Sequence, residues 1–144
     1  MSMDETPRRL HIKFSVPSDP LYLSVVRGAI GPLAAVIGWD ESECRAIALA
    51  VDECLTNVIR HAYHNRADGL MELECRESAD GLEITLLDNG DAPDRSKICA
   101  HEIGGDQPGG LGTHIIQKVM DKVSYEESAQ GNRFVASKQL RKTT

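Results

Sequence analysis

Aromatic side chains are scarce in this sequence, in which two Phe, three Tyr and one Trp occur among 144 residues. The sequence also has no clustered basic patch, and its formal net charge at pH 7 is −6. Proteins that bind nucleic acids contact phosphates with Lys and Arg and often stack bases on aromatic rings. These absences argue against a nucleic-acid surface and favour a protein or a small molecule as the binding partner.

Cysteine occurs four times, without a CxxC pair and without the Cys and His spacing of a zinc site. Two of the four, Cys44 and Cys54, fall in a predicted helix, and the others are Cys75 and Cys99. We therefore expect reduced thiols, packed in the core or lying at the surface, and neither disulfides nor zinc.

Long hydrophobic runs are absent as well. No apolar run approaches the ~20 residues of a membrane-spanning helix, and the N-terminal segment MSMDETPRRL has no apolar signal core. We expect a soluble, cytoplasmic protein without membrane contact. With 41% hydrophobic and 26% charged residues, the composition is typical of a globular protein. The length suits a single domain over residues 1–144, ordered from about residue 8 to about residue 141.

The strongest pattern lies in residues 40–65 and predicts a long amphipathic helix. Asp40 suits the N-cap position, and Glu43 three residues later completes a capping box. Apolar residues then recur at intervals of three and four, as expected for the buried stripe of a helix. The stripe consists of Cys44, Ile47, Ala48, Val51, Leu55, Val58 and Ala62.

Glu53 and Asn57 lie almost opposite that stripe, one helical turn apart, with the small Ala46 and Ala50 above them. A carboxylate on such a face accepts protons, and a carboxamide oxygen is a neutral ligand for a hard cation. Polar residues opposite an apolar stripe also fit an ordinary solvated face. The pair alone therefore does not decide between a ligand site and a solvated surface.

The sequence before this helix predicts a strand and a shorter helix. Residues 10–16 alternate between apolar and polar side chains, which indicates a half-buried strand ended by Pro17. A helix-start signal follows at Pro20, and Gly38 is expected to end the helix. Because Pro32 falls inside the helical pattern, we expect a kink or break there.

The rest of the sequence predicts a β-hairpin within residues 71–86, a long loop, a helix that begins at Leu111 and a final hairpin ending near residue 140. The loop, from about Asp91 to Gly109, is interrupted by Pro and paired Gly and is expected to be a lid or binding loop. Every predicted strand alternates, so each has one buried face. This pattern predicts a two-layer α/β sandwich with helices on one face of an antiparallel-rich sheet.

Two glycine patterns bear on a ligand. Gly109-Gly110-Leu111-Gly112 leaves backbone N–H groups free to approach an anion at the positive end of the following helix, which suits a phosphate. Glycines also occur at ordinary loop ends before helices. At the end of the preceding strand, Asp88 suits an exocyclic amine and Gly90 lets a flat ring lie on the backbone, although the same residues also fit an Asx turn.

The order of these segments resembles the GHKL ATPase superfamily, which includes gyrase, histidine kinases and MutL, and whose ATP site is called the Bergerat fold. The three matching segments are Glu53-Cys-Leu-Thr-Asn57, Asp88-Asn-Gly90 and Gly109-Gly-Leu-Gly112. Within the superfamily, DECLTNVIRHAY, GGLGTHIIQKVMDKVSYE and the closing hairpin are similar to the bacterial serine protein kinase anti-sigma factors. The resemblance covers residues 10–140 and implies a histidine-kinase-like ATPase fold with a mixed, mostly antiparallel sheet.

The resemblance also implies a role for each segment. Glu53 acts as general base, and Asn57 binds ATP and is the magnesium ligand. Asp88 binds the adenine amino group, and Gly90 shapes the wall beside the ring. The third segment contacts the phosphates and comprises Gly109, Gly110, Leu111, Gly112 and Thr113.

The activity implied is that of an ATP- and Mg²⁺-dependent protein serine kinase in transcription regulation. Such a protein sequesters a sigma factor, phosphorylates a serine on an anti-anti-sigma antagonist protein and forms a homodimer. One alternative is the ATP-binding domain of a two-component histidine kinase, but this chain has no room for the phosphoacceptor helices. Another is a non-catalytic switch that binds ATP or ADP. The composition of the lid is compatible with this alternative, because its only cations are Arg95 and Lys97.

Overall fold

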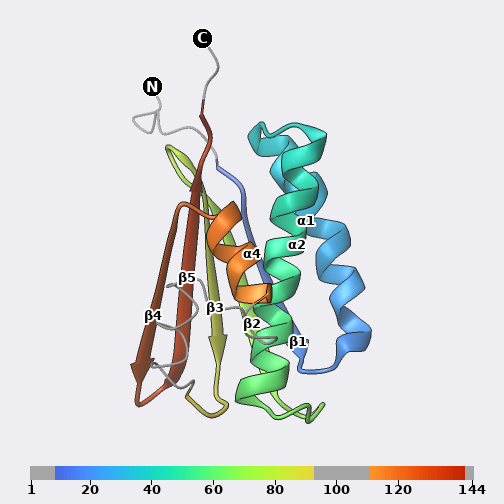
Figure 1. The fold of residues 1–144 in the computed structure, drawn as a ribbon, viewed down its shortest axis with the longest axis vertical. Coiled ribbons are helices and arrows are strands. Elements are labelled where there is room, and N and C mark those ends of the chain that lie inside the picture. The colour runs from blue at the N-terminus through green and yellow to red at the C-terminus, as the bar shows by residue number, and fades with distance from the viewer. Residues whose placement is uncertain (1–8, 93–110, 142–144) are drawn as a thin grey trace, which may run out of the picture.

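The computed structural model describes residues 9–92 and 111–141. They form one five-stranded sheet, in the order β1-β2-β3-β5-β4, with helices stacked against one of its faces (Figure 1). The strands are β1 His11–Pro17, β2 Leu70–Glu77, β3 Gly81–Asp88, β4 Lys122–Ser128 and β5 Gly131–Gln139. The two-layer sandwich is confirmed. The sheet is more regular than the expected mixed one, because every pairing among these five strands is antiparallel.

The alternation in the sequence gives the sheet its buried face. In the β2–β3 hairpin, Leu73 is paired with Leu86 and Cys75 with Ile84, and all four side chains are buried. They pack with the helices into one hydrophobic core, which includes Ile47 of the central helix. β3 is the middle strand of the sheet. It is therefore held by β2 on one side and by β5 on the other, up to its C-terminal end.

The first helix, α1, covers Leu23–Ile37 after a 3-10 turn at Pro20–Tyr22. It stays helical through Pro32, so of the expected kink or break, the break is wrong. A proline has no N–H to donate to the carbonyl four residues earlier. Here that is the carbonyl of Gly28. Both Gly28 and Pro32 are exposed, so water can satisfy that carbonyl. The predicted helix end at Gly38 is confirmed, with a positive φ of 137°.

The central helix, α2, covers Glu41–Asn57. Its predicted N-cap is confirmed, because Asp40 Oδ1 accepts a hydrogen bond from the Glu43 backbone N–H at 2.8 Å. The predicted extent, to residue 65, is wrong. The chain changes to a π-helix over Val58–Ala62, called η2 here, and then turns.

The last described helix, α4, covers Leu111–Val119 and packs against α2. Ile116 and Met120 are buried, in agreement with the apolar stripe. The C-terminal end of α4 is tied to the sheet, because Nζ of Lys138 donates to the Val119 carbonyl oxygen at 2.9 Å.

Three of the cysteines are free and buried, which confirms the expected packing thiols; Cys99 lies outside the described residues. One expectation needs correction, since Pro20–Ile37 is long and apolar enough to cross a membrane by length and composition. Core helices of soluble proteins pass the same test, and α1 buries Val26 and Ile30 completely. Only 22% of this stretch is buried, so α1 packs one face into the core and leaves an outer face that is also apolar.

Candidate functional site

Glu53 and Asn57 lie in the last two turns of α2, and both are partly buried. Their face of the helix is not simply solvated, because Ala50 above them and Cys54 beside them are buried. Burial, followed by the nearby charge of Glu53, raises the pKa of the Cys54 thiol to about 12. The thiol is therefore neutral at physiological pH, which leaves Glu53 and Asn57 as the polar groups of this face.

The π-helix η2 begins directly after Asn57. Its widened turn is closed by a hydrogen bond from the Tyr63 backbone N–H to the Val58 carbonyl oxygen, at 3.1 Å. A π turn holds one residue more than an α turn, so the chain after it is rotated by about 100° from the α2 register. Such turns occur frequently at functional sites. No pattern in the sequence indicated this one, since Val58 and Ala62 also continue the α-helical stripe.

Asp88 is the last residue of β3, and only 7% of it is exposed. Its Oδ1 accepts two hydrogen bonds, from the Gly90 backbone N–H at 2.9 Å and from Nδ2 of Asn132 at 2.8 Å. The hydrogen bond from Gly90 forms an Asx turn, which confirms one of the two interpretations of Asp88 and Gly90 offered by the sequence. Burial raises the pKa of the Asp88 carboxyl, while the hydrogen bonds from Asn132 and Gly90 lower it.

Both of these hydrogen bonds end on Oδ1, and neither uses the second oxygen of the carboxyl, Oδ2. Asp88 thus combines a fixed oxygen with one that can accept from a ligand amine. Asn132, which fixes the first, was not identified from the sequence. The sequence indicated only that Asn132 belongs to a turn before the last strand. Asn132 reaches Asp88 because β5 lies next to β3 in the sheet.

Gly90 lies against the end of η2. A Cβ at this position would lie 2.4 Å from the carbonyl oxygen of Ala62, so only glycine fits. The next residue is bound to the same carbonyl, since the Asp91 backbone N–H donates to Ala62 O at 2.9 Å. The structure therefore brings the end of η2, the segment that directly follows Glu53 and Asn57, into contact with the turn that follows Asp88.

The third predicted segment is described only in part. Gly109 and Gly110 lie outside the described residues, as does the lid apart from Asp91 and Ala92. Leu111, Gly112 and Thr113 form the first turn of α4, as expected for a helix that begins at the glycines. Because α4 packs against α2, its N-terminal turn belongs to the helical layer that also contains Glu53 and Asn57 (Figure 1).

The residues present fit magnesium bound together with a nucleotide. Among the described residues, no group of three His, Cys, Asp or Glu side chains could hold a metal ion by itself. Magnesium rarely needs such a cage, because it keeps several waters and is usually bound by one or two protein oxygens plus substrate phosphates. A single amide oxygen at Asn57 suits that mode of binding.

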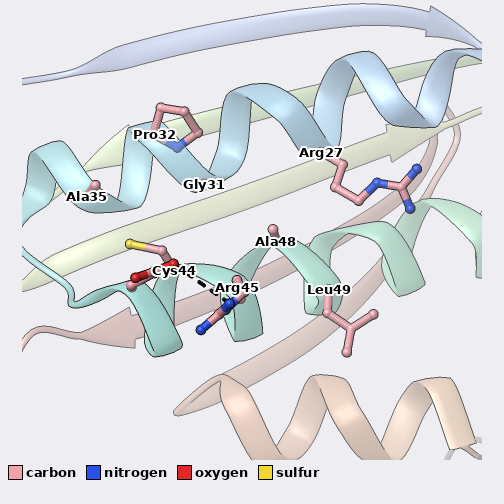
Figure 2. A pocket seen from close by; sticks show the side chains of 9 residues that line it. Arg27, Gly31, Pro32, Ala35, Cys44, Arg45, Ala48 and Leu49 are labelled. Atoms are coloured by element: carbon pink, nitrogen blue, oxygen red, sulfur yellow. Dashed lines mark ion pairs between the residues drawn. The ribbon is translucent and has the colours of Figure 1, made fainter.

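A separate cavity of about 700 Å³ opens between α1 and α2. Figure 2 shows Arg27 and Pro32 of α1 on one side of it and Cys44 and Leu49 of α2 on the other. None of the predicted site residues lines this cavity. It lacks the convergent polar groups that a nucleotide requires.

Comparison with known proteins identifies the family to which the chain belongs. The model of the histidine kinase-like ATPase domain family matches residues 16–138. The chain is 30% identical over 141 residues to the serine-protein kinase RsbW of Listeria innocua, with 90% of each chain covered. It is 27% identical to the serine-protein kinase RsbW of Bacillus subtilis, with 78% of this chain and 76% of that protein covered.

Two solved structures share the fold. The RsbU and RsbW domains of a Mycobacterium tuberculosis protein match with a TM-score of 0.65 at 16% identity, over 92% of this chain and 33% of that one. The histidine kinase domain of a blue-light activated kinase from Erythrobacter litoralis matches with a TM-score of 0.54 at 21% identity, over 83% of this chain and 59% of that one. At these identities the likeness establishes a shared architecture.

Proposed function

The chain belongs to the histidine kinase-like ATPase domain family, and from this premise we propose that it is an ATP-dependent protein serine kinase. The observation that carries the proposal is the contact between Gly90 and Ala62, the last residue of η2, which directly follows Glu53 and Asn57 in the chain. The relatives that match 90% of the chain are named serine-protein kinases, which favours serine as the acceptor.

In this proposal the adenine ring lies at the end of β3. Asp88 Oδ2 accepts a hydrogen bond from the exocyclic amino group, while Asn132 and Gly90 hold Oδ1 in place. The phosphates lie at the N-terminal turn of α4, at the positive end of the helix, and the proposed contacts there are those predicted for the segment from Gly109 to Thr113. Asn57 would hold magnesium, which would supply positive charge against the phosphates.

Glu53 acts as the general base. Its carboxylate accepts the proton of the acceptor serine as the serine oxygen forms a bond to the γ-phosphorus. The bond from the γ-phosphorus to the bridging oxygen breaks at the same centre, and ADP leaves. Glu53 and Asn57 are one helical turn apart, so the base and the metal ligand face the same reacting group.

The partners we propose are a sigma factor, which the protein sequesters, and an anti-anti-sigma antagonist that carries the serine. The outer face of α1 and of the 3-10 turn before it supports a protein partner, because Leu21, Val25 and Val36 are 70%, 65% and 76% exposed. Patches of this kind mark interaction surfaces on soluble proteins. We assign the sigma factor to this face of α1, the helix that also carries Arg27, and further propose a cytoplasmic homodimer that does not bind nucleic acid or membranes.

Incubation of the purified protein with γ-labelled ATP, Mg²⁺ and a candidate antagonist tests the proposal. Label should appear on a serine of the antagonist and disappear when that serine is changed to alanine. Label on histidine would instead identify a two-component histidine kinase. Tight ATP or ADP binding without transfer would identify a non-catalytic switch. The control is Glu53→Gln, which should bind ATP but transfer little.

A further inference from the structure

Tyr63 joins three segments that meet beside the proposed adenine position. It follows η2 directly, and only 6% of it is exposed. Its hydroxyl donates to the carbonyl oxygen of Leu70, at the start of β2, at 2.7 Å. The same hydroxyl accepts a hydrogen bond from the Asn89 backbone N–H at 2.8 Å. One phenol group thus connects the end of η2 with the start of β2 and with the residue after Asp88.

The ring of Tyr63 has little freedom to move. A Cβ on Gly69 would lie 2.5 Å from two of its ring carbons, so the ring packs directly on that glycine. Gly69 is itself fixed, because its backbone N–H donates to the hydroxyl of the fully buried Ser18 at 2.9 Å. The hydroxyl of Tyr63 is therefore held at a defined point of the fold.

The contacts of Tyr63 belong to a larger clamp on the segment from Asp88 to Asp91. Tyr63 holds the Asn89 N–H, and the preceding residue, Ala62, accepts from the Asp91 N–H at 2.9 Å. Gly90, between them, leaves no room for a side chain against Ala62. Asn89, Gly90 and Asp91 therefore each contact either Ala62, the last residue of η2, or Tyr63, which follows it.

We propose that Tyr63 is a positioning residue for nucleotide binding. Through the Asn89 N–H it sets the turn that carries Asp88 and Gly90 at a fixed distance from the helix that carries Glu53 and Asn57. This inference rests on the proposed function, since it concerns the adenine end of the same site. Tyr63 acts on the position of the adenine and leaves the phosphate end unchanged.

The hydroxyl is the group that matters in this arrangement. Without it, the Asn89 N–H and the Leu70 carbonyl both lose a partner in a partly buried place, which is costly for polar groups. The turn is then expected to relax away from η2, and the Asp88 carboxyl shifts with it. Affinity for the adenine moiety falls, while the N-terminal turn of α4 and the amide of Asn57 keep their positions.

Tyr63→Phe tests the inference because it removes only this hydroxyl. We expect the Kd for Mg-ATP to rise about tenfold, as for a lost buried hydrogen bond. The KM for ATP should rise by a similar factor, with kcat at saturating ATP within about twofold of wild type. Tripolyphosphate, used as a competitor that lacks the base, should inhibit both proteins equally. Amide exchange of Asn89 should become faster in the variant.

Tyr22→Phe is the matched control, since it makes the same chemical change on an exposed tyrosine of the 3-10 turn and should leave every one of these measurements unchanged. Equal Mg-ATP affinity in Tyr63→Phe and wild type would overturn the inference. So would an equal loss for ATP and tripolyphosphate, which would indicate general damage to the site. If the wild-type protein failed to bind Mg-ATP, the proposed function itself would fail, and this result is distinct from both.

Discussion

Asp88 and Asn132 face each other across the β3–β5 pair as direct partners in the strand register. Nδ2 of Asn132 donates to Oδ1 of Asp88 at 2.8 Å and also to the carbonyl oxygens of Gly90 and Asp91, at 3.0 and 3.4 Å. One buried amide therefore holds both the carboxylate and the turn after it. In the proposed site this leaves Oδ2 as the oxygen that faces the adenine amine.

Asn132→Ala should weaken ATP binding without removing any group that touches the nucleotide. The variant loses a hydrogen bond to a charged group, which is worth about 1.5 to 3 kcal/mol, and part of this loss appears as weaker binding because Asp88 is no longer held. We expect the Kd for Mg-ATP to rise by roughly tenfold, measured by isothermal titration calorimetry. Ser137→Ala, farther along β5, is the control and should bind ATP as wild type does.

Asp88→Asn should have opposite effects on stability and on binding. The amide oxygen can still accept from Gly90 and Asn132, but the amide nitrogen replaces the oxygen proposed to accept from adenine. ATP affinity should therefore fall by at least about tenfold. Stability at neutral pH should rise, because the variant no longer buries a charge whose desolvation raises the pKa of Asp88.

The same substitution should change how stability depends on pH. Asp88 has a higher pKa in the folded protein than in the unfolded chain, where it is about 3.9. As pH rises above the unfolded-state pKa, the unfolded chain loses its proton first, so the free energy of unfolding falls until pH passes the folded-state pKa. The advantage of Asp88→Asn should grow over this window and then stay constant. Urea unfolding of both proteins across the window measures it, and an advantage that shrinks with rising pH would contradict the assignment.

The sequence allowed prediction of the residues whose signals are local. Asp88 and Gly90 follow an alternating strand directly, and Glu53 and Asn57 lie opposite an apolar stripe, so spacing marked them as candidates and the family resemblance gave them their expected roles. Asn132 could not be found in this way. Its contact with Asp88 exists because β5 inserts between β3 and β4, and this strand order is a property of the whole sheet.

Local rules failed where tertiary contacts or solvent decide the outcome. The break expected at Pro32 does not occur, because the affected carbonyl of Gly28 lies on an exposed face. The π-helix after Asn57 carries no sequence signal, since its residues suit an α-helix equally well. Long-range contacts just beyond its C-terminal end fix its register, because there the Tyr63 hydroxyl binds Asn89 and Leu70.

Pro32→Ala should stabilise the protein, because it restores a helical N–H that can bond the Gly28 carbonyl. Proline is less favourable than alanine inside a helix by about 3 kcal/mol, and part of this is offset because alanine makes the unfolded chain more flexible. We expect the free energy of unfolding to rise by about 1 to 2 kcal/mol, measured by urea unfolding, with ATP affinity unchanged. Gly28→Ala is a control for helix propensity, since its added Cβ meets no atom within 4 Å. A loss of stability in Pro32→Ala would show that the ring packs better than its exposure suggests.

Glu53→Gln and Asn57→Ala should fail in different ways, although the two residues lie one turn apart on α2. Glu53→Gln keeps the shape of the side chain but removes the proton acceptor. Phosphoryl transfer should fall by about 10²- to 10⁴-fold, as is typical for the loss of a general base, while the Kd for Mg-ATP changes little. Asn57→Ala removes the proposed magnesium ligand, so the Kd for Mg-ATP should rise, and the Kd measured in the presence of a chelator should be much less affected.

Both variants should unfold near the wild-type temperature, because neither changes the buried residues Val51 and Leu55. The measurements are ATP titrations with Mg²⁺ and with chelator, then the transfer assay and thermal unfolding. A matched control is Arg45→Ala, on the exposed N-terminal part of α2, where only a surface ion pair with Glu41 is lost. Wild-type binding and transfer in both Glu53→Gln and Asn57→Ala would reduce this face to an ordinary solvated surface. The base and the metal ligand would then have to be sought elsewhere.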